Sequence, residues 1–178
     1  MKKVYIVSSS LRGGSNSEVL ASEFARGVKD NGGQVEFLSL KDFDLKFCIG
    51  CLACQATGRC VLQDDMEGIL DDISDSDVLV FATPVYYYEM SGQLKTFLDR
   101  LNPLYGRDNK FSQVYMLGTC ADSDPRSMDR AISGLEGWIE CFDGVSLAGT
   151  LLATSTDDPN SIDGKFLDIA YEMGKSVE

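Results

Sequence analysis

Short apolar runs alternate with amphipathic stretches along the whole chain. Residues 78–82 form an uncharged run, as expected of a central strand in a parallel sheet. Residues 92–101 have helical spacing, and this helix should end before Pro103. The pattern predicts strands at 4–8, 34–38, 78–82, 113–118 and 145–152, and helices at 15–31, 64–74, 92–101, 125–141 and 161–176.

This alternation predicts one α/β domain over residues 1–178, built on a five-stranded parallel sheet with helices on both faces. Ligands of such sheets bind at the carboxyl ends of the strands, at the point where the strand order reverses. The loops at 8–17, 83–91 and 118–124 each follow a predicted strand. We therefore expect these three loops to converge on one binding site.

The loop at residues 8–17 reads SSSLRGGSNS and has the composition of a phosphate-binding loop. Its two glycines allow the backbone N–H groups to point inward, and the following helix directs its positive end at the same point. The loop lacks the lysine of a P-loop, which favours a terminal monophosphate, such as that of FMN, held mainly by neutral donors. The alternative is an ordinary serine-capped helix start. The candidate phosphate-binding residues are Ser10, Arg12, Ser15, Asn16 and Ser17.

The loop at residues 83–91 reads TPVYYYEMS. Its aromatic rings can cover a face or an edge of a flavin ring, and its backbone amides can reach the polar rim of that ring. The alternative is a tyrosine-rich turn that packs against the domain or a second subunit. Small residues in the third loop, at 118–124, leave room for a planar ligand. The candidate flavin-contacting residues in these two loops are Pro84, Val85, Tyr86, Tyr87, Gly118 and Thr119.

A cysteine-rich loop at about 48–60 holds four of the six cysteines with the spacing C-x2-C-x2-C-x5-C. Four thiolates in this arrangement suit a [4Fe–4S] cluster or a structural zinc. The other alternative is a set of reduced thiols, or a redox disulfide, beside the flavin. Such clustering favours a metal or redox role over a disulfide framework. The candidate metal ligands are Cys48, Cys51, Cys54 and Cys60.

Composition limits the binding partners, the catalytic groups and the location that we expect. The net charge of −12 disfavours nucleic acid and anionic membranes as partners, and it is compatible either with a basic redox partner or with solubility alone. The chain has no histidine, which excludes Ser-His-Asp and Cys-His catalysis and leaves the chemistry to a cofactor or to other side chains. No apolar run is long enough to span a membrane, and the apolar start is too short for a signal peptide, so we expect a cytoplasmic protein.

Taken together, these motifs resemble the NADPH-dependent FMN reductase superfamily and, within it, the iron–sulfur flavoprotein branch. The resemblance runs from Val4 to about Arg100, and the C-terminal part matches only in its strand–helix pattern. Leu11 stands where many relatives have proline, which leaves the loop slightly less rigid. The segments that carry the resemblance are 9–17, the four-cysteine run, 64–66 (DDM), 83–86 (TPVY) and 94–100 (LKTFLDR).

The resemblance implies a flavodoxin-like fold, non-covalent FMN, and a homodimer or homotetramer with FMN near the subunit interfaces. It places Ser10, Arg12, Ser15, Asn16 and Ser17 on the family's phosphate-binding loop and residues 84–87 on its isoalloxazine loop. The four clustered cysteines fall on the compact cluster motif of the iron–sulfur branch.

We therefore expect an FMN-dependent oxidoreductase that takes electrons from NAD(P)H or a reduced protein and passes them to a quinone, a flavin or another acceptor. A [4Fe–4S] cluster is a candidate second redox centre. The chemistry resides on FMN, so no side chain is assigned a catalytic role. One alternative is a non-enzymatic electron carrier that exchanges electrons with a protein such as ferredoxin. The other is a redox-sensing or zinc-stabilised interaction module without flavin.

Overall fold

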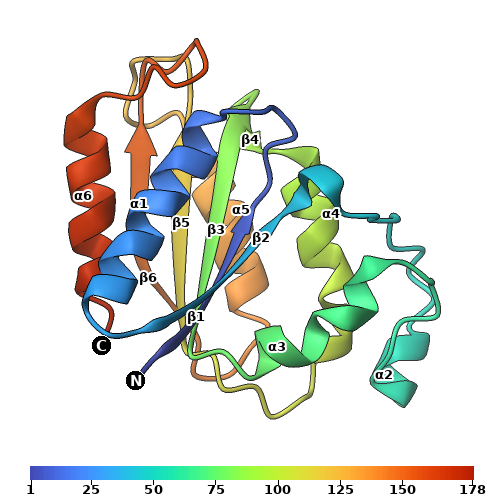
Figure 1. Cartoon of the computed structure of the whole chain (residues 1–178). Helices are drawn as coiled ribbons and strands as arrows, with labels where there is room; N and C mark the ends of the chain where they lie inside the picture. Colours follow the sequence, from blue (N-terminus) through green and yellow to red (C-terminus); the bar gives the residue numbers. More distant parts are fainter.

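The structure, a computed structural model, describes residues 1–178. Five parallel strands form the sheet in the order β2-β1-β3-β5-β6, so the strand order reverses between β1 and β3 (Figure 1). This arrangement confirms the prediction of a five-stranded parallel sheet. A sixth strand, β4, was not predicted; it pairs antiparallel with the end of β3. The strands are β1 (Lys3–Ser8), β2 (Gln34–Ser39), β3 (Val78–Tyr86), β4 (Glu89–Met90), β5 (Gln113–Thr119) and β6 (Ser146–Ala153).

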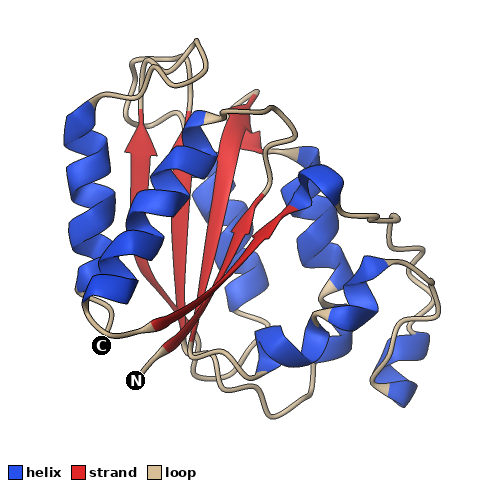
Figure 2. Ribbon diagram, in the orientation of Figure 1, coloured by secondary structure: helices blue, strands red, loops and turns tan.

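Helices cover both faces of the sheet, as Figure 2 shows. On one face, α1 and α6 pack closely because each contributes a glycine at the crossing. A Cβ added to Gly27 would lie 2.0 Å from the Tyr171 carbonyl oxygen, and one added to Gly174 would lie 2.0 Å from that of Phe24. The helices are α1 (Asn16–Asp30), α2 (Ala53–Thr57), α3 (Leu70–Ser74), α4 (Gly92–Arg100), α5 (Asp129–Ile139) and α6 (Gly164–Lys175).

The hydrophobic core has two parts, one on each face of the sheet. Leu20 and Phe24 of α1 pack against Val4, Ile6 and other strand residues on the α1–α6 face. The opposite face holds a larger cluster that α3, α4 and α5 cover. Fully burying each large apolar side chain contributes about 1.5–3 kcal/mol of transfer free energy. These two clusters fix the sheet on which the loops stand.

Two predicted helices are shorter in the structure than in the sequence pattern. Residues 64–74 were expected to form one helix but form a 3-10 turn, Asp65–Gly68, followed by α3. Gly68 weakens a continuous helix here, and the side chain of Asp64 caps the 3-10 turn by accepting the Met66 amide. The predicted helix at 125–141 is also shortened, because residues 125–128 form a turn before α5 begins.

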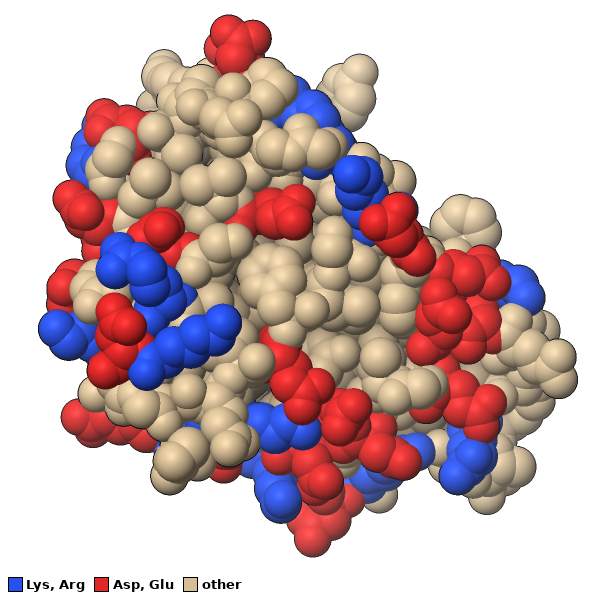
Figure 3. Space-filling view, viewed as in Figure 1, with Lys and Arg blue, Asp and Glu red and all other residues tan.

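None of the helices combines the length and the apolar character that crossing a membrane requires. On the face that Figure 3 displays, lysine and arginine lie in small groups beside acidic side chains rather than in one broad basic surface. This distribution follows from an excess of acidic over basic residues, 28 against 16.

Candidate functional site

Three loops meet at the carboxyl edge of the sheet, beside the reversal between β1 and β3 (Figure 1). Together with the loop after β6 they line a cavity of about 190 Å³, which we call the carboxyl-edge cleft. Nine of the eleven predicted cofactor-binding residues line it, and Tyr87 and Gly118 do not. The lining residues are Ser10, Arg12, Ser15, Asn16, Ser17, Pro84, Val85, Tyr86, Thr119, Cys120, Ala121, Thr156 and Asp157.

The start of α1 supplies hydrogen-bond donors to the cleft. Ser15 is the N-cap, and its hydroxyl accepts the Glu18 amide at 3.2 Å. The amides of Asn16 and Ser17 make no hydrogen bond within the protein, as is usual for the first turn of a helix. The Ser17 hydroxyl is fully buried and lies 3.4 Å from that of Ser15. Open amides, buried hydroxyls and the positive end of a fifteen-residue helix form a site suited to an anion.

The side chains of Asn16 and Arg12 are turned to the loop after β6. The Asn16 amide nitrogen donates to the Asp158 carbonyl at 2.8 Å, and its oxygen accepts the Ser161 amide at 3.0 Å. The exposed Arg12 places its guanidinium 3.5 Å from the Asp157 carbonyl. The donor that Asn16 leaves free for a ligand is therefore its backbone amide, while its side chain fixes the fourth loop of the cleft.

A chain of buried hydroxyl groups joins the first loop to the second. The Ser91 hydroxyl donates to that of Ser9 at 2.9 Å, and Ser9 in turn donates to the Ala82 carbonyl at 3.0 Å. The Ser91 amide donates to the Thr83 hydroxyl at 3.0 Å. Sequence reasoning missed Ser9 and Ser91 as positioning residues. The one sequence signal for Ser91 is its place as a serine N-cap just before α4.

The tyrosines form a strained hairpin at the rim of the cleft. Tyr87 and Tyr88 are the two residues between β3 and β4, and their φ angles are +52° and +67°. A two-residue turn with both φ angles positive normally takes glycine or asparagine. Tyr86 lines the cleft, whereas the Tyr87 side chain is 98% exposed. The hairpin thus holds one ring at the cleft and presents another to solvent.

The loop after β5 closes the cleft with small side chains. Gly118 does not line the cleft, and a Cβ added there would lie 2.1 Å from the Met128 sulfur. Its lack of a side chain therefore serves packing. Cys120, by contrast, lines the cleft. Burial and the charge of Asp122 raise the pKa of the Cys120 thiol, so this thiol stays protonated near neutral pH and is a poor nucleophile.

A second cavity, of about 420 Å³, lies between the cysteine segment and the ends of α4 and α5. We call it the cysteine cavity. Cys48, Cys51, Cys54 and Cys60 all line it, together with Cys141, which sequence reasoning did not single out. Cys48 and Cys51 are exposed, whereas Cys54 is buried. No three of these side chains are gathered into a group that could hold a metal ion.

A buried ion pair fastens the base of the cysteine segment. Arg100 of α4 donates two hydrogen bonds to the Asp64 carboxylate and a third to the Lys46 carbonyl at 2.7 Å. The side chains of Arg100 and Asp64 are 1% and 0% exposed. Burial raises the pKa of the Asp64 carboxyl, but hydrogen bonds from Arg100 and the Lys46 amide outweigh this effect and leave the pKa lowered. Asp64 is therefore ionised at neutral pH.

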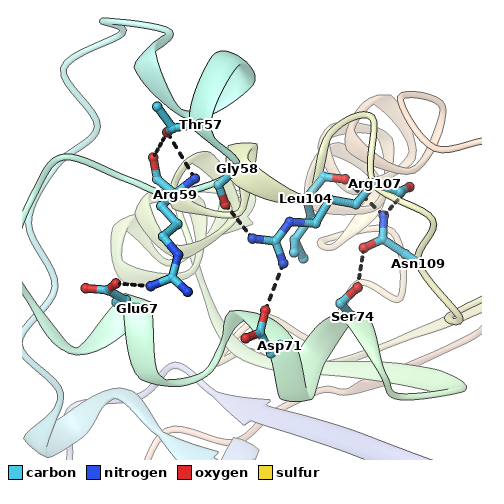
Figure 4. Close-up of polar contacts among 9 residues, drawn as sticks. All are labelled: Thr57, Gly58, Arg59, Glu67, Asp71, Ser74, Leu104, Arg107 and Asn109. Atoms are coloured by element: carbon cyan, nitrogen blue, oxygen red, sulfur yellow. Dashed lines mark hydrogen bonds and ion pairs between the residues drawn. The ribbon is translucent and has the colours of Figure 1, made fainter.

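The C-terminal end of the cysteine segment is held in a similar way (Figure 4). Arg107 donates to the carbonyl of Gly58, at the end of α2, and to the Asp71 carboxylate at 3.0 Å. Arg59 pairs with Glu67 at 2.9 Å. Arg100 thus holds the cysteine segment at Lys46 and Asp64, and Arg107 holds it at Gly58, while residues 47–52 are exposed.

Comparison with known proteins identifies the family of the chain. The family model for NADPH-dependent FMN reductases matches residues 2–157. The chain belongs to this family. The match includes every lining residue of the carboxyl-edge cleft and the whole cysteine segment.

Named relatives of this family member include iron–sulfur flavoproteins. One from Methanocaldococcus jannaschii is 37% identical over 102 residues, which are 57% of this chain and 53% of that protein. One from Archaeoglobus fulgidus is 36% identical over 106 residues, 60% of this chain and 47% of that protein. The matched part is thus about half the length of these relatives. YwqN of Bacillus subtilis, whose name describes an NAD(P)H-dependent FMN-containing oxidoreductase, is 32% identical over 68% of each chain.

Solved structures share the fold. An NAD(P)H:quinone oxidoreductase from Methanothermobacter marburgensis superposes with a TM-score of 0.75 at 18% identity, covering 99% of both chains. An azoreductase from Bacillus anthracis gives 0.74 at 16% identity, covering 99% of this chain and all of that one. At such identities the likeness shows a common flavodoxin-like fold and nothing about substrate.

Proposed function

We propose that this flavin-reductase family member binds FMN in the carboxyl-edge cleft and oxidises NAD(P)H, passing the electrons to a quinone, a flavin or another acceptor. The observation that carries the proposal is the set of open amides and buried hydroxyls at the start of α1. These groups lie where the strand order reverses, which is the usual ligand position in this kind of sheet.

The residues of the cleft fit FMN in charge and in size. Arg12 is the single basic residue of the lining and Asp157 the single acidic one, and the hydroxyls and amides at the start of α1 are neutral donors that suit one terminal phosphate. The cleft volume of about 190 Å³ is below the ~300 Å³ at which small-molecule sites usually begin. The cleft alone would therefore enclose the phosphate and ribityl end, and the ring would lie against Tyr86 at the open rim.

This placement assigns a task to each loop. When bound, FMN supplies hydride and electron transfer. The Ser17 hydroxyl and the amides of Asn16 and Ser17 hold the phosphate, and the Ser9–Ser91–Thr83 hydrogen bonds keep the tyrosine hairpin in register with them. Cys120 stays a neutral thiol and takes no part in nucleophilic chemistry.

A flavin ring at the open rim of the cleft would be accessible to other molecules. We propose that NAD(P)H and the electron acceptor approach from the rim, and that a second copy of the chain covers part of it in a homodimer or homotetramer. The exposed rings of Tyr86, Tyr87 and Tyr88, between 52% and 98% exposed, are the apolar surface available for such contacts.

We also propose a [4Fe–4S] cluster in the cysteine cavity, held by Cys48, Cys51, Cys54 and Cys60. The donor set fits in chemistry, because four thiols line one cavity whose other walls are largely apolar. The four thiols are spread along the cavity, and no three of them form a group that could hold a metal ion. Binding a cluster would draw the exposed Cys48 and Cys51 toward Cys54. Gly50, which has a φ of +64°, lies between Cys48 and Cys51 in the chain.

Anaerobic purification followed by flavin, iron and sulfide analysis tests both cofactor assignments. We expect one FMN per chain, and four irons and four sulfides in the loaded protein. Stopped-flow oxidation of NADH and NADPH, with and without a quinone, tests the activity. Failure to take up FMN would contradict the proposal. If no acceptor supports turnover and the protein exchanges electrons rapidly with a reduced ferredoxin, a carrier would be favoured over an enzyme.

A further inference from the structure

One polar side chain just after the end of α4 reaches a sulfur of the cysteine cavity. Asn102 donates from its side-chain nitrogen to the Cys54 sulfur at 3.0 Å. No hydrogen bond to the sulfur of Cys48, Cys51 or Cys60 accompanies this contact. The four sulfurs therefore differ in the donors that face them.

This donor suits sulfur in its anionic form. A neutral thiol is a weak hydrogen-bond acceptor, so it gains little from an amide donor. A thiolate gains much more, because hydrogen bonds to charged groups are roughly twice as strong as neutral ones. A Cys54 thiolate that binds iron would therefore make full use of the Asn102 donor.

We propose that Asn102 is a positioning residue that stabilises the Cys54 thiolate of the bound cluster and raises the reduction potential of that cluster. The inference rests on the cluster assignment made above. On one-electron reduction the cluster and its ligands gain negative charge, and hydrogen bonds to the ligand sulfurs stabilise the reduced form more than the oxidised form. Electrons from the flavin would then reach the cluster more readily.

Potentiometric titration followed by electron paramagnetic resonance tests this role on the full chain, reconstituted anaerobically with ferrous iron and sulfide. Asn102→Leu removes the donor while keeping a similar shape. We expect about a tenfold fall in the equilibrium constant for one-electron reduction, which corresponds to a potential lower by about 59 mV. Asn102→Asp, which loses the donor and adds a negative charge, should lower the potential further.

Asn109→Leu is the matched control. Asn109 lies in the same connection, and its side chain donates to the carbonyls of Leu104 and Arg107 and accepts from Ser74, without touching a sulfur (Figure 4). The cluster of the Asn109→Leu variant should have the same reduction potential as that of the wild type. A loaded Asn102→Leu protein with an unchanged potential would overturn the tuning role and leave the cluster assignment intact.

Two further outcomes separate this inference from the proposed function. Wild-type protein that takes up FMN but neither iron nor sulfide would overturn the cluster assignment, and the tuning role with it, while leaving the flavin site in place. If the wild type loads and neither Asn102 variant does, Asn102 is needed to build the site, and the tuning role is wrong.

Discussion

The carboxyl-edge cleft and the cysteine cavity are built by different means. Backbone amides and short hydroxyl side chains form the cleft, and most of them lie within a few residues of a strand end. The cysteine cavity depends on side-chain contacts between distant segments, such as Arg100 with Asp64 and Asn102 with Cys54. The first site is held by the sheet itself, whereas the second is held by a few long-range contacts that single substitutions can remove.

This difference has a consequence for cofactor binding. The donors of the cleft are already in place, so we expect FMN to bind a site that changes little. The cysteine segment is fastened at Lys46, Asp64 and Gly58 but has two exposed cysteines between these points. We expect a cluster to order this segment as it binds. Perturbing one cavity should leave the other nearly unchanged.

The largest expected effect comes from breaking the buried ion pair. Arg100→Ala leaves the Asp64 carboxylate buried without its partner, which should lower the free energy of unfolding by about 3–5 kcal/mol. Lys95→Ala, which removes the exposed pair with Asp99, should cost less than about 1 kcal/mol. Urea unfolding at pH 7 measures both. Equal losses in the two variants would mean that the cysteine segment is not fastened by Arg100.

The same pair predicts an acid dependence. The pKa of Asp64 is lowered in the folded protein, so its stabilising contribution is complete above the ordinary aspartate pKa of ~3.9. That contribution is lost as the pH falls through the lowered pKa. The stability gap between the wild type and Arg100→Ala should therefore be widest near pH 7 and narrow below about pH 4. A gap that stays constant between pH 7 and pH 3 would contradict the assignment.

The tyrosine hairpin should be a site of stored strain beside the cleft. Replacing Tyr87-Tyr88 by Asn-Gly supplies residues that tolerate positive φ, and it should raise the free energy of unfolding by about 2 kcal/mol. Thermal and urea unfolding measure the gain. A Tyr88→Phe variant, which keeps the ring and the strain, should show no such change. If the Asn-Gly variant is no more stable than the wild type, the backbone strain is relieved in solution.

The smallest expected effect comes from removing one phosphate donor, and it tests whether the two cavities are independent. Ser17→Ala should weaken FMN binding about tenfold, because one neutral donor to a charged phosphate is lost. Ser22→Ala makes the same change on the exposed side of α1 and should leave the affinity unaltered. Flavin fluorescence titration gives both dissociation constants. Iron uptake should be the same in both variants, and a loss of iron in Ser17→Ala would show that the two cavities are coupled.

Local sequence rules predicted the sheet and the loop positions well. Strand–helix alternation located β1, β3 and β5, and their following loops line one cavity because parallel strands end at the same edge. The β3–β4 hairpin was not predicted because Tyr87-Tyr88 lacks the asparagine or glycine that normally marks such a turn. The helix at 64–74 was overestimated because Asp64 caps a 3-10 turn instead, and Gly68 at its end weakens a continuous helix.

Composition was a weaker guide to the individual side chains. Gly118 was expected to make room for a ligand, but its neighbour is Met128, a contact that only the fold reveals. Asn16 was predicted from its amide group, and that amide is committed to Asp158 and Ser161. Cys141, just beyond the end of α5, also lines the cysteine cavity, which no spacing motif indicates. Long-range partners, unlike strand ends, leave no local pattern.

The most direct test of the central claim is a crystal structure of the chain loaded with FMN. We predict that the phosphate accepts hydrogen bonds from the Asn16 and Ser17 amides at the start of α1, with the ring beside Tyr86. A phosphate bound elsewhere, with these two amides facing only solvent, would contradict the account.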